Sequence, residues 1–380
     1  MSPQCALFLL AIAQLLAMSL WFGASAVAPQ IASEWHLGAS TAAWLTQAVQ
    51  LGFVAGTLLS ATFNLPDVFR PRRLIATCIV IGAAANAILA VAAGSVGVAI
   101  ALRFLTGVAL AGVYPPGMKL IATWFRTGRG FALGVLVGAL TLGKAAPYLI
   151  NAVGSSNWRV NLGFVSILAL LGGALVMTTV REGPYALPTQ PFDITRIAKV
   201  FANRGVRLAS FGYFGHMWEL YAMWAWAPVM LRLALPKRLA EGASFLMIGS
   251  GAIGCIAAGL LADRLGRAKI AATAMAISGA CCLAIGFAFA TPAALLALIV
   301  IWGATVVADS AQFSALVTEH GDPRYLGTAL TLQTCIGFLI TTASIALLPR
   351  VAEIAGWQWA FVALAPGPLL GIVAMVRLGR

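Results

Sequence analysis

Long apolar runs recur along the whole of this 380-residue chain, separated by short polar segments. A helix that crosses the hydrocarbon core of a bilayer needs roughly 20 apolar residues, and these runs reach that length. Charged residues make up only 9% of the chain, whereas soluble domains carry about 25%. Inside a bilayer the backbone must satisfy its own hydrogen bonds, which helices do. The sequence therefore predicts an all-α membrane protein.

Twelve such runs predict twelve transmembrane helices. Their spans are 5–29, 41–63, 73–93, 96–119, 129–152, 160–180, 206–231, 241–262, 269–290, 292–314, 325–348 and 356–376. The first run lacks the basic leading segment and the small-residue cleavage site of a secretory signal peptide, so it is predicted to be the first helix. The six cysteines all fall inside apolar runs without disulfide or metal spacing, and are predicted to be packing residues.

Lysine and arginine are distributed unevenly between the two sets of loops. Of the 24 in the chain, 17 fall on the side that carries both termini. Five fall on the other side: Arg159, Arg232, Lys237, Arg238 and Arg350. Cytoplasmic loops carry the excess of basic residues in membrane proteins, so both termini are predicted to be cytoplasmic. The net charge of +13 is then a topology signal, and no nucleic-acid partner is predicted.

One long polar stretch divides the chain into two halves. The prediction is an N-terminal six-helix bundle over 1–180, a cytoplasmic linker over 181–205 and a C-terminal six-helix bundle over 206–380. The halves are similar in sequence at a constant offset of 199 residues. Matched pairs include Met18 with Met217, Phe22 with Tyr221, Pro29 with Pro228 and Thr106 with Thr305. Internal repeats of this kind are typical of secondary transporters, which bind substrate near the bilayer midplane between the repeats.

Three motifs resemble those of one transporter family. GLLADRLGRAK (259–269) resembles the cytoplasmic loop motif of the major facilitator superfamily, ALRFLTGVALAG (101–112) its helix-4 motif, and GVLVGALTLGKAAP (134–147) its helix-5 pattern. Within that superfamily the sequence is most similar to bacterial nitrate/nitrite- and cyanate-type permeases. The resemblance implies twelve helices in two pseudo-symmetric six-helix bundles, the major facilitator fold. It also implies a central cavity lined by helices 1, 4, 7 and 10, and alternating access by rocking of the two halves.

The loop motif also implies a cytoplasmic gate. Asp263 can accept hydrogen bonds there, and Arg264 and Arg267 can bridge neighbouring helix ends, so that the three residues hold one access state closed. The corresponding loop of the N-terminal half, 58–73, lacks the expected acid. The gate is therefore predicted to depend on the C-terminal copy.

Five ionisable side chains fall within the predicted helices: Arg103, Lys144, His216, Glu219 and Asp309. Each costs on the order of 2.5–3.5 kcal/mol to insert, so such residues normally face a cavity or a partner. Lys144 occupies a helix-5 position that is small or neutral in the family pattern, and is predicted to bind an anionic substrate together with Arg103. Two alternatives stay open. Lys144 could form an ion pair with Glu219 or Asp309, and Arg103 could be structural, pairing with carbonyls or a carboxylate.

Other predicted substrate contacts come from polar and aromatic stripes on the same helix faces. They are Trp21, Tyr148, Trp218, Tyr221 and Gln312. Aromatic packing within the helix bundle is the structural alternative for Trp218 and Tyr221.

Proton coupling is predicted for Glu219 with His216, or for Asp309. Histidine titrates near neutral pH, and His216 lies one helical turn from Glu219. The alternative for these two residues is a satisfied hydrogen-bonded pair. The alternative for Asp309 is gating, because it lies towards the cytoplasmic end of its predicted helix.

The sequence contains no nucleotide-binding loop and no metal-ligand cluster, so no enzyme activity, cofactor or metal is predicted. We predict a monomeric, multi-pass protein of the bacterial inner membrane that moves a small anion or carboxylate and is coupled to protons. Its partners are the solute, protons and the lipid bilayer. A proton-driven exporter of drugs or metabolites is the alternative of the same class. A membrane sensor or scaffold is the alternative of another class, disfavoured by five ionisable residues at depth.

Overall fold

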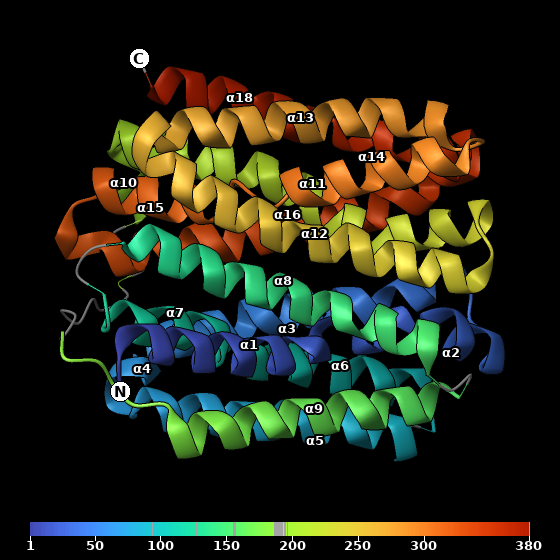
Figure 1. Ribbon diagram of the computed structural model, residues 1–380, viewed down its shortest axis with the longest axis horizontal. Coiled ribbons are helices and arrows are strands. Elements are labelled where there is room, and N and C mark those ends of the chain that lie inside the picture. Colours follow the sequence, from blue (N-terminus) through green and yellow to red (C-terminus); the bar gives the residue numbers. More distant parts are fainter. Residues whose placement is uncertain are drawn as a thin grey trace. The chain divides into compact units, whose positions relative to one another are not determined.

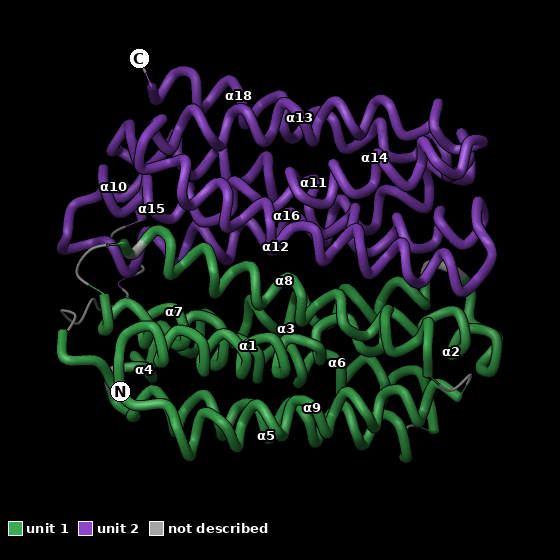
Figure 2. Tube along the Cα trace, viewed as in Figure 1, with its two compact units in different colours: residues 1–189 green, residues 190–380 purple. Residues whose placement is uncertain are grey.

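The computed structural model describes residues 1–92, 94–125, 128–154, 157–185, 193, 195 and 197–379, and all regular elements in these ranges are helices. The chain forms two compact units, residues 1–189 and 190–380, shown in different colours in Figure 2. The predicted linker, 181–205, contains the boundary between them, and much of it lies outside the described residues. Each unit is described by itself.

The helices of the first unit follow one another with short connections (Figure 1). They are α1 (Pro3–Ala26), α2 (Ala28–Glu34), α3 (Ala39–Thr62), α4 (Leu65–Val68), α5 (Pro71–Ala92), α6 (Val96–Ala111), α7 (Tyr114–Ala122), α8 (Arg129–Val153) and α9 (Trp158–Thr179). Within this unit α1 packs against α8 and α9, and α3 packs against α6. Helix α1 therefore lies in the interior of the unit, where most of its C-terminal half is buried.

The second unit repeats this pattern of long helices. They are α10 (Ile197–Ala202), α11 (Arg204–Ala234), α12 (Lys237–Leu265), α13 (Arg267–Ala288), α14 (Pro292–Thr305), α15 (Ser310–His320), η2 (Pro323–Tyr325), α16 (Leu326–Ala355), α17 (Trp357–Ala360), η3 (Phe361–Leu364) and α18 (Pro366–Leu378). Here α11 packs against α16 and α18, and α12 packs against α14.

Eleven segments among the described residues are long and apolar enough to cross a membrane. The one predicted span not among them is 206–231, which the structure shows as the 31-residue helix α11. Its sequence is rich in tryptophan, tyrosine and glycine and includes His216 and Glu219, which lowers its mean hydropathy. Most of its side chains from Val206 to Leu231 are nevertheless buried. Neighbouring helices cover most of this helix, which reduces the need for an apolar surface.

Two of the long segments are interrupted. The helix predicted over 96–119 breaks after Ala111 and restarts at Tyr114, directly before Pro115. The helix predicted over 292–314 breaks between Thr305 and Ser310. A break frees backbone groups that an intact helix would pair. Interrupted helices of this kind often build the binding sites of transporters.

Close helix pairs recur in the two units at glycine. A Cβ atom on Gly107 of α6 would collide with the Val49 carbonyl of α3, and one on Gly303 of α14 would collide with the Met247 carbonyl of α12. Small residues allow transmembrane backbones to approach in this way. The same kind of contact thus holds α3 to α6 and α12 to α14.

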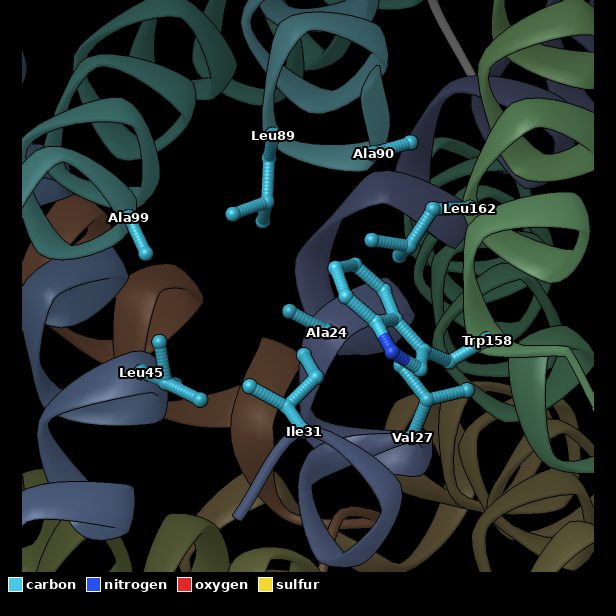
Figure 3. Packing of buried hydrophobic residues seen from close by; sticks show 9 residues of the cluster. All are labelled: Ala24, Val27, Ile31, Leu45, Leu89, Ala90, Ala99, Trp158 and Leu162. Atoms are coloured by element: carbon cyan, nitrogen blue, oxygen red, sulfur yellow. The ribbon is translucent and has the colours of Figure 1, made fainter. Parts of the chain in front are cut away.

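A hydrophobic cluster lies in the first unit where α1 continues into α2 (Figure 3). Its members are Ala24, Val27, Ile31, Leu45, Leu89, Ala90, Ala99, Trp158 and Leu162. Beside it the Trp158 indole and the Arg159 guanidinium both donate to the Glu34 carboxylate, at 2.7 and 2.6 Å. These contacts join α2 to α9, next to the C-terminal end of α1, which contains Trp21.

Candidate functional site

Lys144 lies inside the first unit with only 2% of its surface exposed. It is in the middle of α8, where the neighbouring Gly143 lets α8 approach the α1 backbone at Leu15. The Lys144 Nζ is 4.0 Å from the centroid of the Trp21 ring on α1. A buried ammonium over an indole face gains cation–π attraction, which is strongest where water is excluded. Two residues that were each predicted to bind substrate, Lys144 and Trp21, are therefore in direct contact.

Aromatic rings extend this contact in two directions. The Trp21 and Phe53 ring centroids are 5.0 Å apart, which links α1 to α3. Tyr148, one turn after Lys144 on α8, is buried with its ring 6.4 Å from that of Phe22. The structure thus places Trp21, Lys144 and Tyr148 on the facing sides of two adjacent helices.

Arg103 is fully buried on α6 and donates to three backbone carbonyls. Its Nε bonds Leu45 O at 3.1 Å, its Nη1 bonds Leu20 O at 2.9 Å, and its Nη2 bonds Trp21 O. The guanidinium thereby joins α6 to α1 and α3. This is the carbonyl-paired arrangement that the sequence left open as an alternative. One of the three carbonyls belongs to Trp21, so Arg103 fixes the backbone that carries the Lys144 contact.

Glu219 of α11 is held by three donors in the second unit. Its Oε2 accepts from Ser278 Oγ at 2.9 Å, and its Oε1 accepts from Cys282 Sγ at 3.2 Å and Trp302 Nε1 at 2.7 Å. The carboxylate therefore connects α11 to α13 and α14. The sequence prediction missed the three donors. Their signal was weak: Ser278 and Cys282 share one face of a predicted helix.

His216 lies against Asp309. The His216 Nδ1 and Asp309 Oδ1 are 2.8 Å apart, and both side chains are buried. The Tyr213 and Phe313 rings flank the imidazole, with centroids 5.9 and 5.5 Å away. Within the described residues the second ring nitrogen, Nε2, is buried and has no hydrogen-bond partner. The partnership of His216 with Glu219 suggested by their spacing is thus replaced by one with Asp309, which lies at the break between α14 and α15.

The predicted gate residues form part of a larger cluster at the start of α13. The Arg267 guanidinium contacts Asp263 at 3.1 Å, Glu319 at 2.6 Å and the side-chain oxygen of Gln312 at 3.1 Å. Gln312, predicted to contact substrate, thus accepts from a gate residue. Glu319 was missed because it lies 52 residues from Arg267 and belongs to no motif. Arg264 is in the last turn of α12, beside this cluster.

Trp218 and Tyr221 make packing contacts inside the second unit. The Trp218 indole donates to Ala363 O at 3.1 Å, which ties α11 to η3. The Tyr221 ring lies 5.4 Å from that of Trp224 and 5.1 Å from that of Phe338 on α16. Their contact with substrate stays a prediction.

The sequence offset of 199 also relates contacts in the two units. It matches Arg103 to Trp302 and Leu20 to Glu219. In the first unit the Arg103 guanidinium donates to the Leu20 carbonyl, and in the second the Trp302 indole donates to the Glu219 carboxylate. The same two positions are therefore joined by a hydrogen bond in each unit, with the cation in one and the acid in the other.

Comparison with known proteins identifies the architecture. Residues 10–345 and 243–380 match the Major Facilitator Superfamily. The chain belongs to this superfamily. Membership makes it a multi-pass membrane protein of a superfamily of transporters, which agrees with the eleven apolar helical segments among the described residues.

Three relatives of this major facilitator illustrate its range. It is 26% identical over 262 residues to the probable sulfoacetate transporter SauU of Cupriavidus necator, covering 63% of this chain and 60% of that protein. It is 32% identical over 124 residues to the 3-(3-hydroxy-phenyl)propionate transporter of Escherichia coli, covering 33% and 30%. It is 28% identical over 190 residues to the agnestins efflux protein AgnL12 of Paecilomyces divaricatus, covering 47% and 42%. The chain spans less than two thirds of the length of each.

Proposed function

We propose that this major facilitator carries a small organic oxyanion, a carboxylate or a sulfonate, by alternating access. The observation that supports this most directly is the buried ammonium of Lys144 against the Trp21 ring. A cation at this depth costs free energy to insert, and a bound anion offsets that cost. The same charge repels cationic solutes.

Two relatives favour this solute class. Sulfoacetate bears a carboxylate and a sulfonate, and 3-(3-hydroxyphenyl)propionate bears a carboxylate, as the names of these relatives state their solutes. The resemblance to nitrate/nitrite- and cyanate-type permeases gains no support from them. The agnestins efflux protein keeps export as a second candidate, which differs in the direction of transport.

Proton coupling is proposed for the pair of His216 and Asp309. The two side chains meet at a helix break, and the His216 Nε2 is available to take up or release a proton. The Glu219 carboxylate, in contrast, uses both oxygens to hold α13 and α14. We assign it an anchoring role.

The remaining architecture follows the family. Helix α11 is proposed as the twelfth membrane span, so that a monomer of two six-helix bundles alternates access by rocking of its halves. Both termini face the cytoplasm of a bacterial cell, with the protein in the inner membrane. The cluster of Asp263, Arg264 and Arg267 is the cytoplasmic gate, and its ion pairs break in each cycle.

Uptake by the purified protein in liposomes tests the anion proposal. The solutes are sulfoacetate, 3-(3-hydroxyphenyl)propionate, nitrate and the cation tetraphenylphosphonium, each with and without a pH gradient. We expect uptake of one or both organic acids, and a loss of at least about tenfold in Lys144→Ala, since roughly 1.4 kcal/mol of binding corresponds to that factor. Lys237→Ala, which alters an exposed lysine at the start of α12, is the matched control.

Three results would contradict the proposal. Uptake in Lys144→Ala equal to that of the unaltered protein would remove the anion site. Transport of tetraphenylphosphonium alone would favour a drug exporter. No transport of any solute in either direction would favour a sensor or scaffold.

A further inference from the structure

Gln50 of α3 is a fully buried amide whose hydrogen bonds are not satisfied by the protein. Its exposed fraction is 0%, and among the described residues neither its Nε2 nor its Oε1 has a hydrogen-bond partner. An amide buried without partners costs free energy that an apolar side chain of similar size avoids. Buried polar groups are paired in the great majority of cases. Packing within the first unit therefore does not explain why a glutamine is present at position 50.

The register of two helices places Gln50 beside the Lys144 site. The hydroxyls of Thr46 on α3 and Ser25 on α1 are 2.7 Å apart, which fixes the alignment of the two helices. Consecutive spans run in opposite directions, so one turn forward on α3 lies opposite one turn back on α1. That pairs Gln50 with Trp21. Phe53, three residues further, confirms the register because its ring contacts that of Trp21.

We propose that Gln50 is a second binding residue for the transported anion, and that its amide N–H donates to an oxygen of the carboxylate or sulfonate beside Lys144. This inference rests on the proposed function and names the residue that orients the solute. The ammonium of lysine is a point charge on a flexible stem and attracts an anion without fixing its direction. A carboxamide is planar and offers two N–H donors in one plane. The two groups together distinguish an oxyanion, which accepts directed hydrogen bonds, from a halide.

Thr57 supports the assignment from the same face of α3. It lies two turns beyond Gln50, and its hydroxyl is also buried without a hydrogen-bond partner in the described part of the chain. A single unpaired group can be an isolated packing defect, but two on one stripe follow the period of a helix face. This stripe begins at Thr46, whose hydroxyl is bonded to Ser25.

The test combines transport with stability, because a structural and a binding role change them in opposite ways. In Gln50→Leu we expect the KM for uptake of sulfoacetate or 3-(3-hydroxyphenyl)propionate to rise about tenfold, as for loss of one hydrogen bond to a charged group. The Tm of the purified protein without solute should stay equal or rise, because no hydrogen bond is lost. Gln50→Glu keeps the size and adds a negative charge, so uptake should fall further.

Asn86→Leu is the matched control. Its amide is equally buried, but its Nδ2 donates to Leu162 O and Ser166 Oγ, both at 3.0 Å. This variant should lower the Tm and leave the KM within about twofold. A KM unchanged in Gln50→Leu, or a Tm lowered as in Asn86→Leu, overturns the proposal for Gln50 and leaves the anion transporter standing. Failure of the unaltered protein to transport either acid overturns the proposed function, and the inference with it.

Discussion

The guanidinium of Arg103 uses its donors on the backbone of two neighbouring helices, including the carbonyls of Leu20 and Trp21. This arrangement explains why an arginine is present at a depth where its charge is costly. The carbonyls that it contacts lie inside helices and each offers a second lone pair, and the planar fork of arginine reaches several at once. The residue acts on the site through the position of Trp21.

Arg103→Lys should therefore destabilise the protein rather than weaken solute binding alone. Lysine carries one compact ammonium and cannot reach all three carbonyls, and each lost hydrogen bond from a charged donor costs roughly 1.5–3 kcal/mol. We expect a lower Tm in thermal unfolding of the purified protein. Arg159→Lys, at a half-exposed ion pair with Glu34, should change the Tm little. An unchanged Tm in Arg103→Lys with lost uptake would instead indicate direct contact with the solute.

At the residue scale, the sequence predicted which side chains matter better than it predicted their partners. The cost of a charge in a membrane helix singles out Lys144, Glu219 and Asp309 from one helix alone. Their partners depend on which faces of distant helices meet. Spacing along α11 favours His216 with Glu219. In the fold His216 instead contacts Asp309, and Glu219 contacts Trp302.

At the scale of elements, α11 shows how burial and function depart from hydropathy. Its helical form was predicted, and the predicted span 206–231 lies within the observed helix Arg204–Ala234. Its low mean hydropathy is not typical of a membrane span. The breaks between α6 and α7 and between α14 and α15 were not predicted, although Pro115 follows directly after the first; the second contains no proline. Proline constrains the backbone locally, whereas the second break depends on tertiary packing.

Helix α11 and the α14–α15 break together supply the proposed proton site, which gives a second prediction. In Asp309→Asn, uptake of the organic acid should lose its response to a pH gradient, because the amide cannot exchange a proton with His216. Glu219→Gln should retain that response, since the amide oxygen can still accept from Trp302. Uptake with and without an imposed gradient measures both. The opposite outcome, a response lost in Glu219→Gln and kept in Asp309→Asn, would move the proton role to Glu219.

At the scale of the whole molecule, the two units share a design and differ in charge. The offset of 199 matches the hydrogen bond of Arg103 to Leu20 with that of Trp302 to Glu219. Each half has one ionisable side chain in this bond, Arg103 in the first and Glu219 in the second. The first unit holds the cations near the proposed anion site. The second holds the acids near the proposed proton site.

Whether α11 crosses the membrane decides whether this symmetry is real. An even number of spans places both termini on one side, and the count of lysine and arginine predicts that side to be cytoplasmic. If α11 crosses, the connection before α12 at Lys237 lies outside, and α10 at Lys199 lies inside. If α11 stays on one side, the two lysines lie on the same side. Its polar side chains can be inserted because Glu219 is bonded to α13 and α14, and His216 to Asp309, as partner helices do for polar residues in membranes.

Cysteine accessibility in the full chain distinguishes these topologies. In a variant with the six native cysteines replaced, Lys237→Cys should react with a membrane-impermeant maleimide in intact cells. Lys199→Cys should react only after the cells are permeabilised. Arg350→Cys, in a predicted outer connection, and Lys269→Cys, in a predicted inner one, are the controls for each side. Equal labelling of Lys237→Cys and Lys199→Cys in intact cells would mean that α11 does not cross. The bundles would then have six and five spans, and the rocking of two matched halves would have no structural basis.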